Sequence, residues 1–199
     1  MTRRGLAMLA CAVACVLGAA GAARAGCPPA GETQASLLAQ KAGQWQAAPD
    51  APAAACQALA LALVDCLADP DPALRDDLAF DALQTWMRAG LLTPATLHTL
   101  RSGLLATLAA PADAAGFRQP FAALVLAEVA RVDRLQPFLS ADERSTLVTQ
   151  AARYLAEVRD LRGFDPVDGW RHGVAQASTA PCGRRLRSSE TTLVSSRYT

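Results

Sequence analysis

The chain has 199 residues, enough for one domain with a substantial core; 52% are hydrophobic and only 5% aromatic. Ala and Leu dominate and β-branched residues are sparse, so the composition predicts an all-α protein. The formal charge of +1 includes +3 in residues 1–25 and +3 in residues 173–199, so residues 26–172 carry −5. This mildly acidic body lacks the basic surface that a phosphate backbone requires, and we predict no nucleic-acid partner.

Residues 1–25 have the three parts of a secretory signal. Two arginines near the N-terminus form the positive region, an apolar stretch covers residues 6–17, and Ala-Arg-Ala at 23–25 is a small-x-small cleavage site. The apolar stretch is too short to span a bilayer comfortably. We therefore expect cleavage between Ala25 and Gly26, no membrane span afterwards, and a periplasmic or secreted protein.

Cysteine usage agrees with an oxidising compartment, because four cysteines remain after cleavage. Cys56 and Cys66 are ten residues apart on one predicted helix, about 15 Å by helical rise, and cannot bond to each other. Cys27 can form a disulfide with either of them, and buried free thiols are the alternative. An arginine precedes the cleavage site where lipidation requires an aliphatic residue, so no lipid on Cys27 is expected. None of the spacings, Cys182 included, is a zinc pattern, and no metal or cofactor is predicted.

The mature chain reads as a series of helices with clear starts. Residues 26–52 contain one short helix, at about 32–45, and residues 53–172 form the predicted helical domain. Asp71 and Thr93 are N-caps followed by proline, and Ser140 with Glu143 forms a capping box. Further helices are expected at about 53–68, 72–89, from 94 to the loop at 111–116, 120–135 and 141–161.

Apolar residues at helical spacing define the predicted core faces. They are, in chain order, Leu74, Leu78, Ala82, Leu83, Trp86 and Met87; Leu97, Leu100, Leu104, Leu105 and Leu108; Phe121, Leu124, Val125, Val132 and Leu135; and Leu147, Val148, Ala151, Tyr154, Leu155, Val158 and Leu161.

The helices can be grouped in pairs. First helices begin near 53, 94 and 141, close to the ~40–47-residue period of HEAT-type arrays. The Asp-Pro-Asp-Pro turn followed by Arg75 at the start of the next helix is a further HEAT-like feature. We predict HEAT-like antiparallel helix pairs forming a short α-solenoid, with an irregular bundle as the alternative. On this scheme the helix at 141–161 needs a partner that starts near Trp170.

Three segments resemble a bacterial family labelled domain of unknown function 2785: "CLADPDPALRDDLAFDALQTWMRAG", "PFAALVLAEVARVD" and "RDLRGFDPVDGWRHGVA". The resemblance covers about residues 55–175. It implies an all-α, HEAT-like fold and no particular activity. It also implies a second His four residues after His172, where this chain has Gln176, so a two-histidine metal set is not expected here.

The last residues differ in composition from the rest. Ser, Thr and Arg replace the helical apolar spacing after Val174, and residues 173–199 are predicted to be a disordered tail. A reading-frame shift near residues 174–176 explains the change of composition, and a genuine disordered tail is the alternative. The helical domain is therefore expected to be truncated.

The densest polar cluster lies between residues 159 and 172. Arg and Trp there could bind an anionic or sugar-like ligand; alternatively, its charged groups cap and pair at the end of the preceding helix and Trp170 lies in the core. The candidate ligand-binding residues are Arg159, Arg162, Asp165, Asp168, Trp170 and His172.

Two other ionisable residues have simpler interpretations. His98 is expected on the surface or with its hydrogen bonds satisfied. Glu128 is expected to pair with Arg131 one turn along the helix.

The sequence contains no nucleophile elbow, phosphate loop or paired-carboxylate pattern. We predict a binding or scaffolding module whose partner is a protein or peptide. The alternative is a hydrolase-like or metal-dependent enzyme with its site near Arg162–His172.

Overall fold

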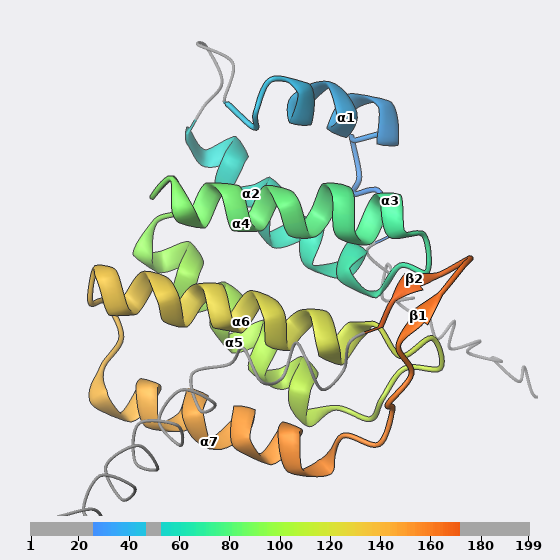
Figure 1. The fold of residues 1–199 in the computed structure, drawn as a ribbon. Coiled ribbons are helices and arrows are strands. Elements are labelled where there is room, and N and C mark those ends of the chain that lie inside the picture. Colours follow the sequence, from blue (N-terminus) through green and yellow to red (C-terminus); the bar gives the residue numbers. More distant parts are fainter. Residues whose placement is uncertain (1–25, 47–52, 172–199) are drawn as a thin grey trace, which may run out of the picture.

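The computed structural model describes residues 26–46 and 53–171 and is built almost entirely from helices (Figure 1). The predicted all-α class is confirmed; one two-stranded hairpin is the exception. The elements are α1 (Gln34–Ala42), α2 (Ala53–Ala62), the 3-10 helix η1 (Leu63–Ala68), α3 (Pro72–Leu74), the π-helix η2 (Arg75–Phe80), α4 (Asp81–Arg88), α5 (Pro94–Ala109), α6 (Arg118–Leu135), α7 (Ala141–Glu157), β1 (Phe164–Asp165) and β2 (Gly169–Trp170).

Successive helices are stacked in the order of the chain. The continuous helical segment α3–η2–α4 packs against α6, α2 packs against α5, and α7 lies against α5 on the far side from α1 (Figure 1). The HEAT-like repeat remains a prediction, since packing order alone does not distinguish it from a bundle.

Helix starts follow the local signals in the sequence. The Asp71 carboxylate accepts a hydrogen bond from the amide of Ala73 at 2.8 Å, and Pro72 occupies the first helical position. Thr93 caps α5 in the same way, through the Thr96 amide. Ser140 and Glu143 form the predicted capping box of α7.

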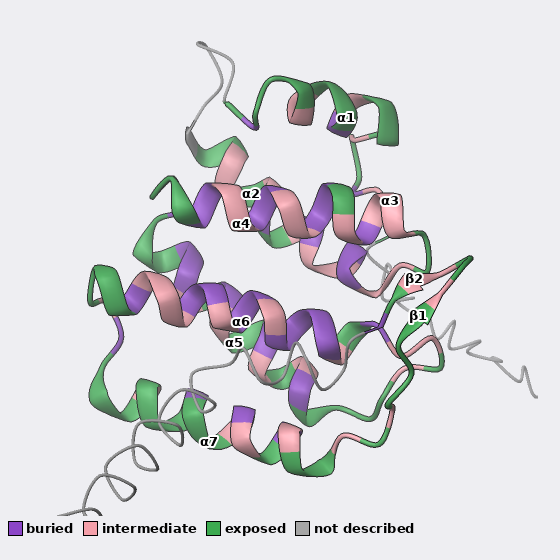
Figure 2. Ribbon diagram, viewed as in Figure 1, coloured by how far each residue is buried: buried purple, intermediate pink, exposed green. Residues whose placement is uncertain are grey.

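The core lies around α6, which is buried over most of its length (Figure 2). The predicted apolar face of α5 is confirmed, because Leu97, Leu100, Leu104 and Leu108 are buried. Three residues assigned to core faces are instead exposed: Leu135, Val148 and Leu161. Helical spacing identifies the correct face, but it does not show where the neighbouring helices end.

The N-terminal segment is attached to this core by a disulfide and two tryptophans. Of the two partners left open for Cys27, the structure pairs it with Cys66, and Cys56 is a free thiol. The Trp86 indole donates to the carbonyl of Trp45, and the two rings contact edge to face at 5.7 Å. The segment 26–46 is thus held against η1 and α4.

The end of α7 differs from the prediction. The helix stops at Glu157, not near Leu161, and a β-hairpin follows it. The partner that the repeat scheme requires from near Trp170 would lie mostly outside the described residues. Asp165 accepts hydrogen bonds from the amides of Val167 and Asp168, and so stabilises a turn that competes with helix. Gly169, with φ of 78°, completes the turn.

Several predictions concern residues outside the described ranges. The signal, its cleavage between Ala25 and Gly26, His172 and the tail at 173–199 are all among them. Within 26–46 and 53–171, no helix is both long enough and apolar enough to span a membrane.

Candidate functional site

The polar cluster predicted at 159–172 extends from the end of α7 into the hairpin, and Asp160, Arg162 and Arg171 meet beside Gly116. Arg159 lies at the end of α7, where its guanidinium donates to the carbonyls of Ala156 and Val158. Arg162 pairs with Asp160, with Nε and Oδ1 2.8 Å apart. These contacts fit the interpretation of capping and pairing better than that of a ligand site.

The remaining cluster residues belong to the hairpin. Asp165 forms its turn, and Asp168 pairs with Arg171. Trp170 is 51% exposed and contacts Phe164 with ring centroids 5.2 Å apart, so its assignment to the core is wrong. His172 lies outside the described residues.

Arg75 attaches the hairpin to the helical body and was not identified as a site residue from the sequence. Its fully buried guanidinium donates to the carbonyls of Asp69, Pro70 and Asp168 at 2.8–3.0 Å. It also lies 3.8 Å from the centroid of the Phe117 ring. The HEAT-like sequence pattern located this arginine but gave no reason to expect burial.

Gly116 lies where the loop after α5 meets the segment after α7. The Arg171 guanidinium binds the carbonyl of Ala115 and lies 4.5 Å from the centroid of the Phe117 ring. A Cβ atom at Gly116 would lie 2.5 Å from the Asp160 carboxylate, and φ there is +79°. The positive φ and the crowding by these side-chain ends both favour glycine at this position.

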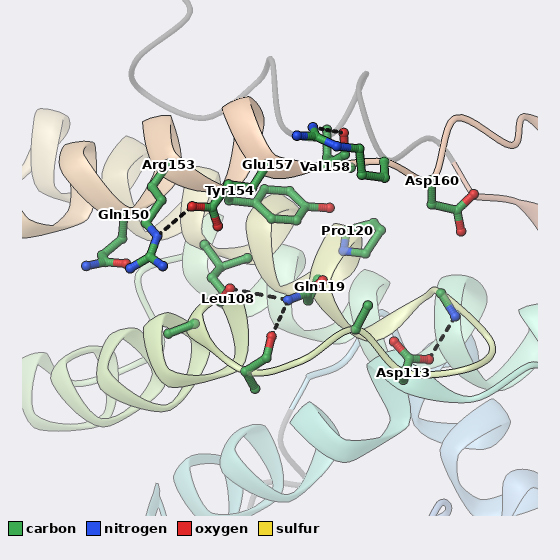
Figure 3. Close-up of a pocket in the computed structure, with 15 residues that line it drawn as sticks. Leu108, Asp113, Gln119, Pro120, Gln150, Arg153, Tyr154, Glu157, Val158 and Asp160 are labelled. Atoms are coloured by element: carbon green, nitrogen blue, oxygen red, sulfur yellow. Dashed lines mark hydrogen bonds and ion pairs between the residues drawn. The ribbon is translucent and has the colours of Figure 1, made fainter.

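A pocket of about 400 Å³ opens beside this junction (Figure 3). It lies between the C-terminal end of α5, the loop that follows it, the start of α6 and the C-terminal half of α7. Apolar atoms form most of its wall, and several charged side chains also line it. The lining residues are Leu108, Ala109, Ala110, Ala112, Asp113, Gly116, Gln119, Pro120, Gln150, Arg153, Tyr154, Glu157, Val158, Arg159 and Asp160.

Tyr154 contributes a buried hydroxyl to the pocket. The residue is 6% exposed, and its hydroxyl has no hydrogen-bond partner among the described residues. Figure 3 shows the hydroxyl pointing to the side of the pocket that Asp160 occupies. Burial, together with the charges of Asp160 and Asp113, raises the pKa of Tyr154 to about 12, so the phenol is neutral at physiological pH.

Some charged residues of the pocket lining have a partner of opposite charge, and others do not. Arg153 pairs with Glu157 at 2.9 Å. The hydrogen bond from Arg162 lowers the pKa of the Asp160 carboxyl and keeps it ionised. Asp113 accepts only backbone amides, those of Gly116, Phe117 and Arg118, and no cation of the described ranges forms an ion pair with it.

Residues 104–181 match the model of a family described as Protein of unknown function (DUF2785). This match agrees with the family resemblance of the sequence, over a stretch shorter than the 55–175 that the resemblance suggested. No curated protein and no solved structure matches the chain.

The DUF2785 match contains the whole pocket, since the lining residues lie between 108 and 160. It also contains the hairpin and Arg171, whereas Arg75, which holds the hairpin from the other side, precedes it. Sequence reasoning missed the pocket because Tyr154 was assigned to a core face. An isolated tyrosine on an amphipathic helix gives no signal that its hydroxyl lacks a partner.

The two other ionisable residues have defined partners. Glu128 pairs with Arg88 of α4 at 2.6 Å, so the predicted pairing with Arg131 is wrong. The ion pair joins α6 to α4 and does not lie along α6, because the Glu128 side chain faces the core. His98 contacts Glu143 at 3.0 Å and the Phe138 ring, which fits the expected satisfied histidine.

Neither metal ligation nor thiol chemistry is favoured by the described residues. In the described portion, no three His, Cys, Asp or Glu side chains are grouped so that they could hold a metal ion. Burial raises the pKa of the Cys56 thiol, which makes the reactive thiolate less available.

Proposed function

We propose that this is an exported helical protein that acts as a binding module, with its ligand site in the pocket at Tyr154. The signal-like residues 1–25 support export. The Cys27–Cys66 disulfide supports it independently, because disulfides persist in oxidising compartments outside the cytosol.

The observation that carries the binding function is the Tyr154 hydroxyl. Burying a hydroxyl without a partner costs about 1–3 kcal/mol by mutational measures. Proteins satisfy such groups in the great majority of cases, and one that faces a pocket is satisfied when a ligand fills that pocket. The mostly apolar wall with a few convergent polar groups is typical of ligand sites.

Binding is favoured over catalysis because the polar groups near Arg162 already have structural roles. Arg162 binds Asp160, Arg171 binds Asp168 and Ala115, and Asp165 stabilises the hairpin turn. Groups engaged in this way fix the shape of the pocket rim. A hydrolase-like or metal-dependent enzyme would need free acid–base groups or metal ligands there.

The binding function is tested by observing the Tyr154 ring signals by NMR while four probes are added separately: n-butylamine, butyrate, N-methylacetamide and glucose. We expect saturable shifts with at least one probe. The variant Ala112→Trp places a large side chain at the pocket wall and should abolish them. Ala106→Trp is the control, because Ala106 is exposed on α5 outside the pocket. If no probe shifts the Tyr154 signals, the pocket is not a ligand site.

Export is tested by the intact mass of protein recovered from the periplasm or the medium. We expect a chain beginning at Gly26, without lipid on Cys27, and lighter by two hydrogens than the reduced form because of the Cys27–Cys66 bond. A diacylglyceryl adduct on Cys27, or recovery of uncleaved chain in the cytosol, would contradict the proposal.

A further inference from the structure

We propose that the pocket at Tyr154 binds an ammonium group on an aliphatic stem, such as a lysine side chain of a polypeptide partner. This inference rests on the proposed binding function and specifies the chemistry of its ligand. It depends on three features of the pocket: a carboxylate that belongs to no ion pair of the described residues, a buried neutral phenol and an apolar wall.

The carboxylate is that of Asp113. Its three hydrogen bonds come from backbone amides of its own loop, at 2.9–3.3 Å, and no cation of the described residues forms an ion pair with it, although Arg162 acts on it from a longer distance. The other lining charges are better compensated. Arg153 and Glu157 pair with each other, Asp160 pairs with Arg162, and Arg159 binds carbonyls at the C-terminal end of α7, which carries partial negative charge.

The phenol of Tyr154 makes the interior of the pocket selective for hydrogen-bond donors. Asp113 and Asp160 together produce a negative potential at its oxygen, as the direction of their effect on the pKa of Tyr154 shows. An anionic ligand would be repelled there. An ammonium donor is attracted, and it gives the phenol oxygen the hydrogen bond that the described residues do not supply.

The wall suits a methylene chain. Leu108, Ala109, Ala110 and Val158 present aliphatic surface, and Gln119 closes the end of α5 by donating to the carbonyls of Leu108 and Ala110. A volume of about 400 Å³ lies within the ordinary range for small-ligand pockets. A lysine side chain buries such a stem while its charged head meets polar groups.

The decisive comparison uses two ligands of nearly equal shape on the full exported chain. Nα-acetyl-lysine N-methylamide carries the ammonium, and Nα-acetyl-norleucine N-methylamide lacks it. We expect the lysine derivative to bind with a Kd on the order of 1 mM, as a ligand of its size allows, and at least about tenfold more tightly than the norleucine derivative. The ammonium group could come from a lysine of a polypeptide or from a free alkylamine, and the probe n-butylamine distinguishes these two ligands. Weaker binding of n-butylamine than of the lysine derivative indicates a polypeptide partner. Equal binding indicates a free alkylamine.

Two variants assign the effect to the pocket. Tyr154→Phe should weaken binding of the lysine derivative several-fold without lowering the unfolding midpoint, because removing an unpartnered buried hydroxyl does not destabilise the fold. Asp113→Asn keeps one oxygen acceptor for the loop amides and should remove most of the preference for lysine over norleucine. Asp142→Asn, an exposed carboxylate at the opposite end of α7, is the control for loss of negative charge.

The outcomes separate this inference from the proposed function. Equal affinity for the lysine and norleucine derivatives overturns the ammonium preference and leaves a binding pocket. Lysine-selective binding that survives both Tyr154→Phe and Asp113→Asn places the site elsewhere and also overturns it. If none of the probes binds the wild-type chain, the binding function itself fails. The comparison of ligands on the wild-type chain holds even if Asp113→Asn does not fold.

Discussion

Helices α6 and α7 are almost equal in length, 18 and 17 residues, yet α6 buries nine side chains and α7 only three. Other helices pack on several sides of α6, whereas α7 packs chiefly against α5. The buried carboxylates of α6 are paired across helices, Glu128 with Arg88 and Asp133 with Arg144. On α7, the buried Tyr154 hydroxyl has no partner among the described residues.

The difference shows that two kinds of interaction hold the molecule together. Buried apolar side chains stabilise the centre of the molecule, and the few charged groups buried there form ion pairs. At the C-terminal end, guanidinium groups attach a hairpin that buries little apolar surface: Arg75 binds Asp168, and Arg171 binds Ala115. A pocket therefore forms beside α7, where packing is least complete.

Removing the Arg75 guanidinium should give the largest effect. Arg75→Met keeps much of the side-chain volume but removes the buried guanidinium that binds the carbonyls of Asp69, Pro70 and Asp168, so unfolding free energy should fall by about 3–5 kcal/mol. Urea denaturation measures this loss, and hydrogen exchange should rise at residues 164–170. Arg159→Met, at an exposed site, should change stability by less than ~0.5 kcal/mol. A similarly small effect of Arg75→Met would show that arginine contacts do not hold the hairpin.

Loss of the Cys27–Cys66 disulfide should follow in size. The bond closes a loop of 39 residues, and the chain-entropy account gives a loss of about 2–4 kcal/mol when Cys27 and Cys66 are both replaced by alanine. Cys56→Ala should cost about 1 kcal/mol or less, because Cys56 is a half-buried free thiol. Denaturation with and without a reductant checks the prediction. Wild-type stability that does not change on reduction would contradict it.

Asp133 should make the contact between α6 and α7 sensitive to acid. Hydrogen bonding to Arg144 is the main cause that lowers the pKa of this carboxyl from 3.8 to about 2. A depressed pKa contributes stability that is present above about pH 4 and is lost as pH falls to about 2, roughly 2 kcal/mol in total. Stability measured from pH 7 to pH 2 should fall less steeply below pH 4 in Asp133→Asn. An unchanged slope would show that other carboxyls dominate the acid response.

The smallest predicted effect tests the crowded junction beside the pocket. Gly116→Ala and Gly90→Ala both place a side chain at positive φ, which costs about 1–2 kcal/mol each. Only Gly116→Ala also brings a Cβ atom against Asp160 and Arg162, since nothing lies within 4 Å at Gly90. We expect Gly116→Ala to be the more destabilising by about 1 kcal/mol in denaturation. Equal losses would mean that Asp160 and Arg162 move aside freely.

Much of the helical framework could be predicted from the sequence. Asp71, Thr93 and Ser140 each mark a helix start, because a cap depends on residues two or three positions away. The leucine face of α5 was equally predictable from its period. The hairpin was not predicted, although Asp165-Pro166 and Asp168-Gly169 are turn dipeptides, because its two strands have only two residues each and are held by distant arginines.

The sequence by itself determined the helical class, the helix starts, and the short set of cysteines able to pair. The tertiary structure alone decided that Cys27 pairs with Cys66, that Arg75 is buried against a carbonyl 93 residues away, and that the Tyr154 hydroxyl faces a pocket without a partner. Local structure follows from steric and hydrogen-bonding preferences over one or two turns. Burial and the pairing of polar groups depend instead on which distant segments meet, and periodicity within one helix contains no information about that.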